Sequence, residues 1–242
     1  HSTSRRQRQM CIRDRVYNDF FIGEGADVTI VAGCGVHSDG SESARHNGIH
    51  RFFLEKGAKV LYKEKHIGTG KGTGLRRIDP VTDAYLKEDS YLEMDTVQLR
   101  GVDRTTRSTS AVLDKGAKIV VRERIMTDGD EDAVTKFKVE LNGEDCGADV
   151  VSRSVARGNS HQAFYSVIEG NARCTGHSAC DAILADNGRV DAQPALNAAN
   201  VDAALIHEAA IGKIAGDQIM KLCSLGLTRE EAEEKIIEGF LK

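Results

Sequence analysis

The sequence of 242 residues contains no tryptophan, only 5% aromatic residues, and just two prolines, at positions 80 and 194. This scarcity disfavours a globular core built on large aromatic side chains. No apolar run approaches the roughly 18 residues of a membrane-spanning helix, so we expect no membrane association. The N-terminus also lacks the apolar segment of a secretory signal peptide, and we expect a cytoplasmic protein.

The six cysteines are spread along the chain without the close spacing of a disulfide framework. This distribution indicates reduced thiols in a cytosolic protein. Glycine, in contrast, is plentiful, with 24 residues. A chain rich in glycine and small aliphatic residues suits a fold that turns often and stacks small side chains.

Positive charge is concentrated in residues 1–15, which contain five arginines and one aspartate. The rest of the chain contains 28 lysines and arginines against 36 acidic residues. Such an acidic body is a poor partner for nucleic acid, because phosphate contacts need a positive surface. The basic segment has no hydrophobic periodicity, and patterned sequence begins abruptly at Val16. We therefore interpret residues 1–15 as a non-native or disordered leader.

One pattern recurs along the chain: an aliphatic residue, two further residues, Gly-Ala, one residue, and a second aliphatic residue. It occurs at Ile22–Val28, Leu54–Val60 and Leu113–Ile119, with its second half at Gly147–Val150 and a degenerate copy at Leu86–Leu92. The anchor positions 25, 57, 89, 116 and 147 are separated by 32, 32, 27 and 31 residues. Looser copies surround residues 170 and 188. A period of this size is the signature of a stacked, solenoidal fold.

Apolar and polar residues alternate after each anchor, with the period of a strand that has one buried face. The glycine supplies the tight corner before each strand. The pattern predicts a mainly β fold, a parallel β-helix over residues 16–213. A β-sandwich with hairpins is the alternative, because the Asn-Gly and Asp-Gly pairs at 39–40, 47–48, 128–129 and 142–143 suit hairpin turns. The alternating apolar positions are Val28/Ile30, Val60/Tyr62, Leu92/Met94, Ile119/Val121 and Phe137/Val139/Leu141.

The pattern becomes helical in the C-terminal region, residues 214–242. A helix is expected from about Gly216, with Gly226 as its stop signal. Thr228 and Glu231 form a capping box that opens a second helix. Because a helical hairpin this small is not stable alone, it must pack on the β-helix, on a partner, or on both. The apolar stripe of the second helix consists of Ala232, Ile236, Ile237, Phe240 and Leu241.

Two stretches rich in glycine or histidine resemble binding motifs only in part. The run HIGTGKGTG at residues 66–74 does not match a phosphate-binding loop, which needs G-x-x-x-x-G-K-[ST] before a helix, so we interpret it as a flexible connection. Cys34 and His37 have metal-like spacing, as do His46 and His50. Zinc needs about four ligands, and neither pair has a matching second pair, so we interpret these four as ordinary loop residues.

The segment Cys174-x-x-His177-x-x-Cys180 is a stronger candidate for a binding site than these two stretches. On a strand, even spacing places the two cysteines on one face and His177 on the other, so the three do not bind one ion without a bulge. His207-Glu208 lies in an apolar run, where an ionisable residue is costly unless it is paired or used. Either His207 and Glu208 have ordinary structural roles, or one or both act with Cys180 as ligands or acid–base groups.

Seven motifs follow one another between Arg157 and Lys242: Gly158-x-Ser160, Ala179-Cys180-Asp181, Gln193-Pro194, Ile206-His207-Glu208-Ala209, Lys213-Ile214-x-x-Asp217-Gln218, Gly226-Leu227-Thr228-x-Glu230-Glu231-Ala232 and Gly239-Phe240. In these motifs and their spacing, the segment resembles the C-terminal part of the SufB/SufD family of iron–sulfur cluster assembly proteins. The resemblance implies a right-handed parallel β-helix followed by a small C-terminal α-helical hairpin.

The resemblance also implies a non-catalytic cytoplasmic scaffold. Such a subunit forms a homodimer or a SufB/SufD-type heterodimer, binds a SufC-like ABC ATPase, and holds a transient iron–sulfur cluster at the subunit interface. ATPase activity is expected only in the partner. Carried over by motif, Cys180 matches the essential SufB cysteine, Glu208 its paired acid, and His207 a histidine used on the partner subunit. The implied ATPase-docking region includes Asp217, Thr228, Glu231, Ile236 and Phe240.

Thiolate, imidazole and carboxylate are all competent iron ligands, so Cys180, His207 and Glu208 are the candidate cluster site. The chain is shorter than full-length SufB, whose N-terminal cysteine cluster is not seen here, which suggests a compact SufD-like or minimal single-type member. One alternative is a purely structural SufD-like subunit without its own cluster. A more remote one is a β-helix carbohydrate-active enzyme, which would normally use aromatic platforms that this composition does not favour.

Overall fold

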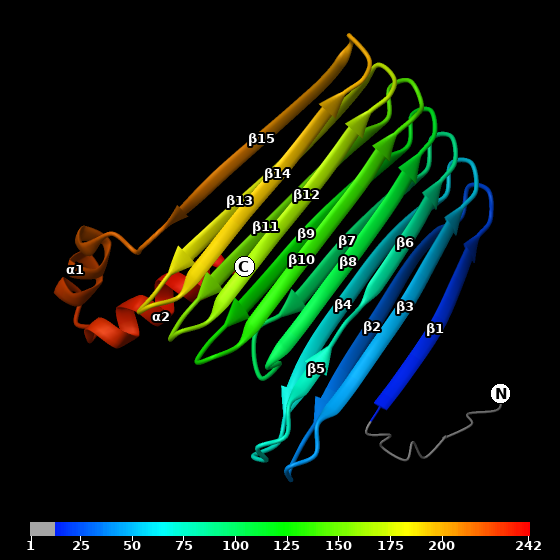
Figure 1. The fold of residues 1–242 in the computed structure, drawn as a ribbon. Helices are drawn as coiled ribbons and strands as arrows, with labels where there is room; N and C mark the ends of the chain where they lie inside the picture. The colour runs from blue at the N-terminus through cyan, green and yellow to red at the C-terminus, as the bar shows by residue number, and fades with distance from the viewer. Residues whose placement is uncertain (1–12) are drawn as a thin grey trace.

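The computed structural model describes residues 13–242, which form fifteen β-strands and two C-terminal α-helices (Figure 1). The elements are β1 Arg13–Ile22, β2 Asp27–His37, β3 Ala44–Leu54, β4 Lys59–Thr69, β5 Arg76–Ile78, β6 Val81–Leu86, β7 Tyr91–Gln98, β8 Arg104–Leu113, β9 Lys118–Thr127, β10 Asp132–Leu141, β11 Gly147–Ala156, β12 His161–Gly170, β13 Cys174–Leu184, β14 Arg189–Ala198, β15 Ala203–Gly212, α1 Gly216–Ser224 and α2 Arg229–Phe240.

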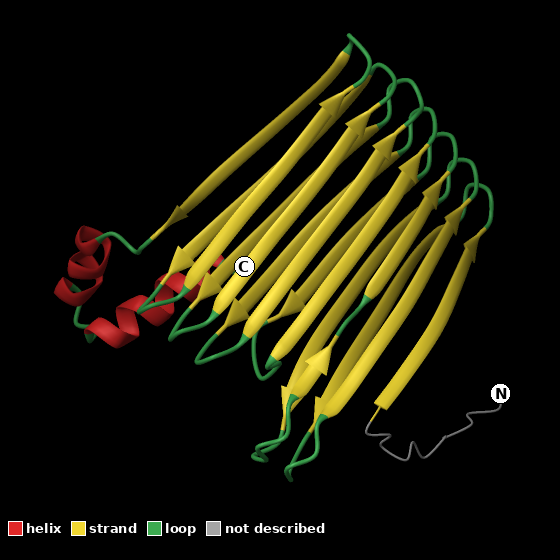
Figure 2. Ribbon diagram, viewed as in Figure 1, coloured by secondary structure: helices red, strands yellow, loops and turns green. Residues whose placement is uncertain are grey.

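The strands form two sheets, and the chain crosses from one to the other at the corners of each turn. One sheet has the order β1-β3-β5-β8-β10-β12-β14, with β6 between β3 and β8, and the other has the order β15-β13-β11-β9-β7-β4-β2. Every strand pairing is parallel. The predicted parallel β-solenoid with two C-terminal helices is confirmed (Figure 2). The β-sandwich alternative is wrong, because hairpins would produce antiparallel neighbours.

The core is a column of aliphatic side chains between the two sheets. Side chains at the same position of successive turns stack on one another, as Leu86, Leu113 and Leu141 do, each no more than 2% exposed. The predicted alternation is confirmed from Val60 to Leu141, whereas Val28 and Ile30 in the first turn are only partly buried. Each buried Leu or Ile stabilises the fold by about 1.5–3 kcal/mol.

The predicted anchors mark one corner of the solenoid. Gly25, Gly57 and Gly116 have positive φ angles of 65°, 66° and 68°, and Asp89 has a φ of 57°. The fifth corner is formed by Asp145, with a φ of 61°, rather than by the predicted Gly147, which lies in β11. Aspartate takes this role because its short polar side chain tolerates the left-handed region.

A second series of left-handed corners was not predicted. Its members are Gly101, Gly129, Gly158 and Asp186, with φ angles of 75°, 58°, 60° and 53°. The looser repeats expected near residues 170 and 188 do not belong to either series, since Gly170 ends β12 and Gly188 directly precedes β14. The solenoid therefore turns at two kinds of corner, and the Gly-Ala pattern identifies only one.

The glycine-rich run at 66–74 is a close-packed segment. His66 and Gly68 belong to β4, and the connection after it stacks on the preceding turn. A Cβ atom at Gly70 would lie 2.1 Å from the Ser38 carbonyl oxygen, and one at Gly72 would lie 2.3 Å from that of Gly40. The interpretation as a connection is correct for its second half, but its glycines are needed because two backbones touch.

The C-terminal helices follow the predicted signals. Gly226 ends the first helix with a φ of 100°, and the capping box is present: the Glu231 N–H donates to Thr228 Oγ1 and the Thr228 N–H donates to Glu231 Oε2. Ile237 of α2 and Leu241, which directly follows the helix, pack against Val155 of β11. Neither helix of the described residues is long and apolar enough to cross a membrane.

The predicted leader at residues 1–15 lies outside the described residues, except for the three residues that begin β1. The described β-region then extends from β1 to the end of β15, and the helices follow from Gly216.

The stacking of corners predicts different costs for two glycine substitutions. Gly129→Ala meets open space and should cost about 1–2 kcal/mol, the strain of a left-handed alanine. Gly101→Ala adds a clash, because its Cβ would lie 2.2 Å from the Gly68 carbonyl oxygen. We expect Gly101→Ala to cost about 1–3 kcal/mol more than Gly129→Ala in urea unfolding. Equal losses in the free energy of unfolding for the two variants would show that the backbones of adjacent turns are not in tight contact at Gly101.

Candidate functional site

The three predicted site residues lie in the last turns of the solenoid. Cys180 is on β13, and His207 and Glu208 are on β15, the edge strand of that sheet. The parallel register pairs Cys180 with Ala209 and Ser178 with His207. Cys180 and His207 therefore lie on the inner face of two adjacent strands, offset by two residues in register.

Glu208 points the opposite way. Its side chain is 70% exposed on the outer face, where Oε2 lies 3.7 Å from Nε2 of His177. The other ring nitrogen of His177 contacts Asp149 at 2.8 Å, and Arg122 holds the same Asp149 carboxylate at 2.7 Å. The structure thus places Cys180 and His207 on the inner face of the solenoid, and Glu208 and His177 on the outer face. Cys180 and His177 lie on opposite faces, as the spacing predicts.

Cys180 is only 1% exposed. It lines a cavity of about 10 Å³ together with Glu123, Ser152 and Phe164, which is room for about one water molecule. Burial raises the pKa of the Cys180 thiol to about 12, and the nearby carboxylates of Glu123 and Asp181 contribute to the rise. Cys180 is therefore a neutral thiol near pH 7, and it becomes a thiolate only when a cation binds or the site opens.

His207 is partly buried on the inner face of β15. Its Nδ1 atom is buried and has no hydrogen-bond partner among the described residues. A buried imidazole nitrogen without a partner is unusual, because desolvation without a compensating bond is costly. A metal ion bound at Nδ1 would satisfy it. This atom and the Cys180 sulfur are the two inner-face donors of the predicted site.

A buried polar network adjoins the site and was not predicted. The Glu123 carboxylate accepts hydrogen bonds from Ser152 at 2.7 Å and from Thr135 at 3.1 Å, and Arg107 Nε lies 3.2 Å from it. The Arg107 guanidinium also donates to Nδ1 of His66 at 3.0 Å. The signal was present in the sequence, because Glu123 and Arg107 continue the inward-facing alternation of β9 and β8.

The network continues toward the first turns through Glu64. Burial alone would raise the pKa of this carboxyl, but His50, His66 and Arg107 together hold the pKa well below its usual value. Burial lowers the pKa of His66, which keeps that imidazole neutral. Charged and polar groups therefore run through the interior from the first turns to the cavity beside Cys180.

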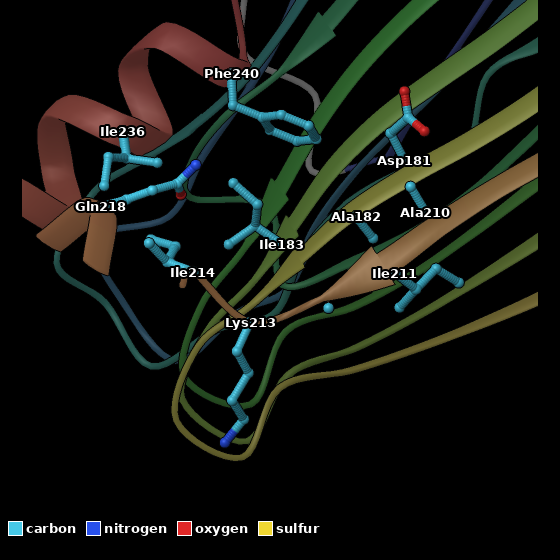
Figure 3. Close-up of a pocket in the computed structure, with 11 residues that line it drawn as sticks. Asp181, Ala182, Ile183, Ala210, Ile211, Lys213, Ile214, Gln218, Ile236 and Phe240 are labelled. Carbon is cyan, nitrogen blue, oxygen red and sulfur yellow. The ribbon is translucent and has the colours of Figure 1, made fainter. Parts of the chain in front are cut away.

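The predicted docking residues lie on the two helices. Ile236 and Phe240 of α2 line a pocket of about 500 Å³ between the helices and the end of β13 and β15, shared with Ile183 and Ile214 (Figure 3). Thr228 and Glu231 are engaged with each other in the capping box, and the Asp217 carboxylate accepts from the N–H of the next residue. Of the five predicted residues, Ile236 and Phe240 thus form an open apolar surface.

The profile of one protein family, described as "SUF system FeS cluster assembly, SufBD core domain", matches residues 17–240. The chain belongs to the SufBD core family. The match covers both the β-solenoid and the C-terminal helices, so the predicted resemblance is confirmed over a longer region than the motifs that first indicated it.

Several relatives named "iron-sulfur cluster assembly SufBD family protein" are similar to this SufBD chain. One from Archaeoglobus fulgidus is 29% identical over 231 residues, which is 95% of this chain and 61% of the relative. One from Methanothermobacter thermautotrophicus is 29% identical over 95% of this chain and 56% of the relative. One from Methanocaldococcus jannaschii is 26% identical over 92% of this chain and 70% of the relative. The chain spans about six tenths of the first two relatives.

The environment of Cys180 predicts slow alkylation in the native protein. With a pKa of about 12, the thiolate fraction near pH 8 is on the order of one in ten thousand. Iodoacetamide should therefore modify Cys180 at least about tenfold more slowly than the partly exposed Cys223, as measured by mass spectrometry of digested samples. The rate should still be rising above about pH 10. Modification of both cysteines at one rate would refute the buried-thiol assignment.

Proposed function

We propose that this chain is a cytoplasmic scaffold subunit of a SUF-type iron–sulfur cluster assembly complex that holds or transfers a nascent cluster at a subunit interface. The observation that carries the proposal is the inner-face pair Cys180 and His207 at the last turn of a SufBD solenoid. A thiolate and an imidazole are both established types of ligand to iron in clusters. The cluster is the cargo of this scaffold, and iron–sulfur assembly is the activity.

The position of the pair at a sheet edge supports a subunit interface. β14 and β15 end the two sheets of the described solenoid, and the side chains of residues 193–198 are exposed on both faces. Leu196, Ile206 and Ile211 expose 37%, 57% and 39% of their surface. An exposed strand edge with apolar side chains favours pairing with another chain. We propose a homodimer or a SufB/SufD-type heterodimer formed at this edge.

Pairing at the edge also offers a role for Glu208. Its carboxylate is on the outer face of β15, opposite the Cys180 sulfur. β15 is an edge strand, with fewer constraints than the strands inside the sheet, so pairing with a second chain can introduce a bulge that turns the Glu208 side chain inward. We propose that Glu208 joins Cys180 and His207 as an iron ligand in the assembled complex. Iron would replace the proton on the buried thiol, because a bound cation deprotonates a coordinating sulfur.

The C-terminal helices are the proposed docking surface for a SufC-like ABC ATPase. Met220 and Leu225 of the α1 region are 67% and 72% exposed. Ile236 and Phe240 of α2 line an apolar pocket together with Gln218 of α1 (Figure 3). The same pocket is lined by Ile183, three residues after Cys180 on β13. A partner bound there would press on the strand that carries the buried thiol. In this proposal ATP hydrolysis belongs to the partner, and this chain is not an enzyme.

One observation favours a second candidate function, a purely structural SufD-like subunit. Cys180 is buried beside Glu123 with a raised pKa, which is the environment of an unreactive cysteine. In that case the solenoid would complete the dimer and bind the ATPase, and the cluster would be held by the other chain alone.

Cys180→Ala separates these two functions. If Cys180 binds the cluster, complexes purified anaerobically with the ATPase and the partner chain should lose at least about 90% of their iron and acid-labile sulfide, because alanine removes the sulfur ligand. Cys174→Ala is the matched control, since Cys174 is buried on the same strand and face. Iron and sulfide at wild-type levels in Cys180→Ala would instead establish the structural role.

Ile236→Asp tests the docking surface. A carboxylate in the pocket should weaken ATPase binding by at least tenfold, because it places a charge in an apolar contact. Lys235→Ser, one residue away and exposed, is the control and should bind as wild type does. Isothermal titration calorimetry with the purified ATPase measures both. If Ile236→Asp binds the ATPase with unchanged affinity, the docking surface does not include this pocket.

A further inference from the structure

A second group of possible ligands lies in the first turns of the solenoid, inside the sheets. Cys34 of β2, His50 of β3 and Glu64 of β4 offer a sulfur, an imidazole nitrogen and a carboxylate oxygen, all within 4.8 Å of one another. We propose that these three residues bind one divalent transition-metal ion of the zinc or iron(II) class. This site is distinct from Cys180 and stands whether or not the proposed assembly function is correct.

The sequence did not reveal this group, because the pattern pairs Cys34 with His37 and His46 with His50. In the structure His37 faces outward at the end of β2, where its ring contacts Asp39 and Thr69. Cys34 faces inward and lies beside His66 in register. The interpretation of Cys34, His37, His46 and His50 as loop residues is wrong, since the first two lie on β2 and the other two on β3.

Burial makes this arrangement unusual. His50 is 3% exposed and Glu64 is 4% exposed, and His50 Nε2 lies 3.4 Å from Glu64 Oε1 without forming a hydrogen bond. Among the described residues this nitrogen has no hydrogen-bond partner. Leaving it unsatisfied costs about 1–3 kcal/mol, which a metal–nitrogen bond would offset.

Space for an ion is left by a glycine. A Cβ atom at Gly48 would lie 2.7 Å from His50 Nε2, so glycine keeps the region in front of that nitrogen clear. Ions of this class bind nitrogen, oxygen and sulfur at about 2.0–2.3 Å, so their donor atoms stand roughly 3–4 Å apart. The three side chains can reach that spacing through shifts of about 1 Å.

The surrounding groups orient the proposed ligands. The Asn18 amide Nδ2 lies 3.2 Å from His50 Nδ1 and can only donate to it, so the His50 hydrogen lies on Nε2 in the metal-free chain. A metal at Nε2 would move that hydrogen to Nδ1, and the Asn18 amide would turn so that its oxygen accepts from Nδ1–H. The Tyr62 hydroxyl donates to Glu64 Oε1 at 3.0 Å. Arg107 can only donate to His66 Nδ1, so His66 carries its hydrogen on Nε2, 3.1 Å from the same oxygen. The His66 Nε2–H therefore faces the Glu64 carboxylate without forming an aligned hydrogen bond, and His66 is not itself a ligand.

Formal charge also favours a cation. The interior network holds two carboxylates, Glu64 and Glu123, and one guanidinium, Arg107, which leaves one negative charge in excess. A divalent ion with the Cys34 thiolate adds one positive charge and makes the network neutral, as burial requires. The sulfur ligand selects zinc or iron(II) over magnesium or calcium, which prefer oxygen. A proton on His50 would balance the charge equally, so the experiment must distinguish the two.

Anaerobic titration of the metal-free chain with Co²⁺ tests the site. We expect one equivalent to bind, with the near-ultraviolet thiolate-to-cobalt absorption of a sulfur ligand. Cys34→Ser should abolish that absorption, and Gly48→Ala, which blocks the space before Nε2, should weaken binding at least tenfold. Cys180→Ser is the matched control and should leave both the absorption and the affinity unchanged.

Thermal unfolding with Zn²⁺ provides a second readout that does not depend on the absorption band. Zn²⁺ should raise the Tm of the wild type and Cys180→Ser, but not that of Cys34→Ser, because only a folded ligand set binds it. Circular dichroism confirms that each variant is folded. Failure of the folded wild type to bind Co²⁺ would leave a protonated His50 as the balancing charge and overturn the proposal. Absorption that survives Cys34→Ser, or that disappears in Cys180→Ser, would also overturn it by placing the metal elsewhere.

Discussion

Everything in this molecule depends on the parallel backbone pairing between successive turns. Pairing in register places each inward-facing side chain on its counterpart in the next turn, so the interior is a stack of matched positions. Apolar residues fill such a stack without geometric difficulty, as Leu54, Leu113 and Leu141 show. A polar residue at an inward position must instead find a partner in a neighbouring turn, because water is excluded. That requirement explains why Glu123, Arg107 and Glu64 occur as a connected network.

The same constraint separates the two candidate sites. In the first turns, Cys34, His50 and Glu64 meet because three successive strands bring their inner faces together. In the last turns, Cys180 and His207 share an inner face, but β15 has no further strand beyond it in the described solenoid. Each group therefore includes a residue on a terminal strand of the described solenoid, Cys34 on β2 and His207 on β15, and another chain can complete the edge formed by β15. A buried thiol at such an edge can be protected in the free chain and opened in a complex.

Sequence predicted the fold well where a single residue type is physically required. A left-handed corner favours glycine, so Gly25, Gly57 and Gly116 revealed the period directly. The prediction failed where another residue type can take the same backbone conformation, as Asp145 does. The second series of corners lacks the neighbouring alanine and escaped the pattern.

Site residues were predictable only from the resemblance of motifs or from the alternation of side chains between the two faces of a strand. Alternation alone places Cys180 and His177 on opposite faces, and the structure confirms that separation. It does not give the register between β13 and β15, on which the pairing of Cys180 with His207 depends. Cys34, His50 and Glu64 lie 16 and 14 residues apart in the sequence, and only the offset between turns brings them together. The spacing of residues within one strand does not show how that strand is aligned with the strands of the neighbouring turns.

The central claim is that the inner-face donors Cys180 and His207 hold the cluster, joined by Glu208 in the assembled complex, and that His177 on the outer face does not. Pulsed electron paramagnetic resonance of the reduced cluster in the assembled complex tests it most directly. Wild-type complex should show nitrogen hyperfine coupling from a coordinated imidazole, and His207→Ala should lose that coupling while His177→Ala retains it. Coupling that persists in His207→Ala and disappears in His177→Ala would place the cluster on the outer face and contradict the claim.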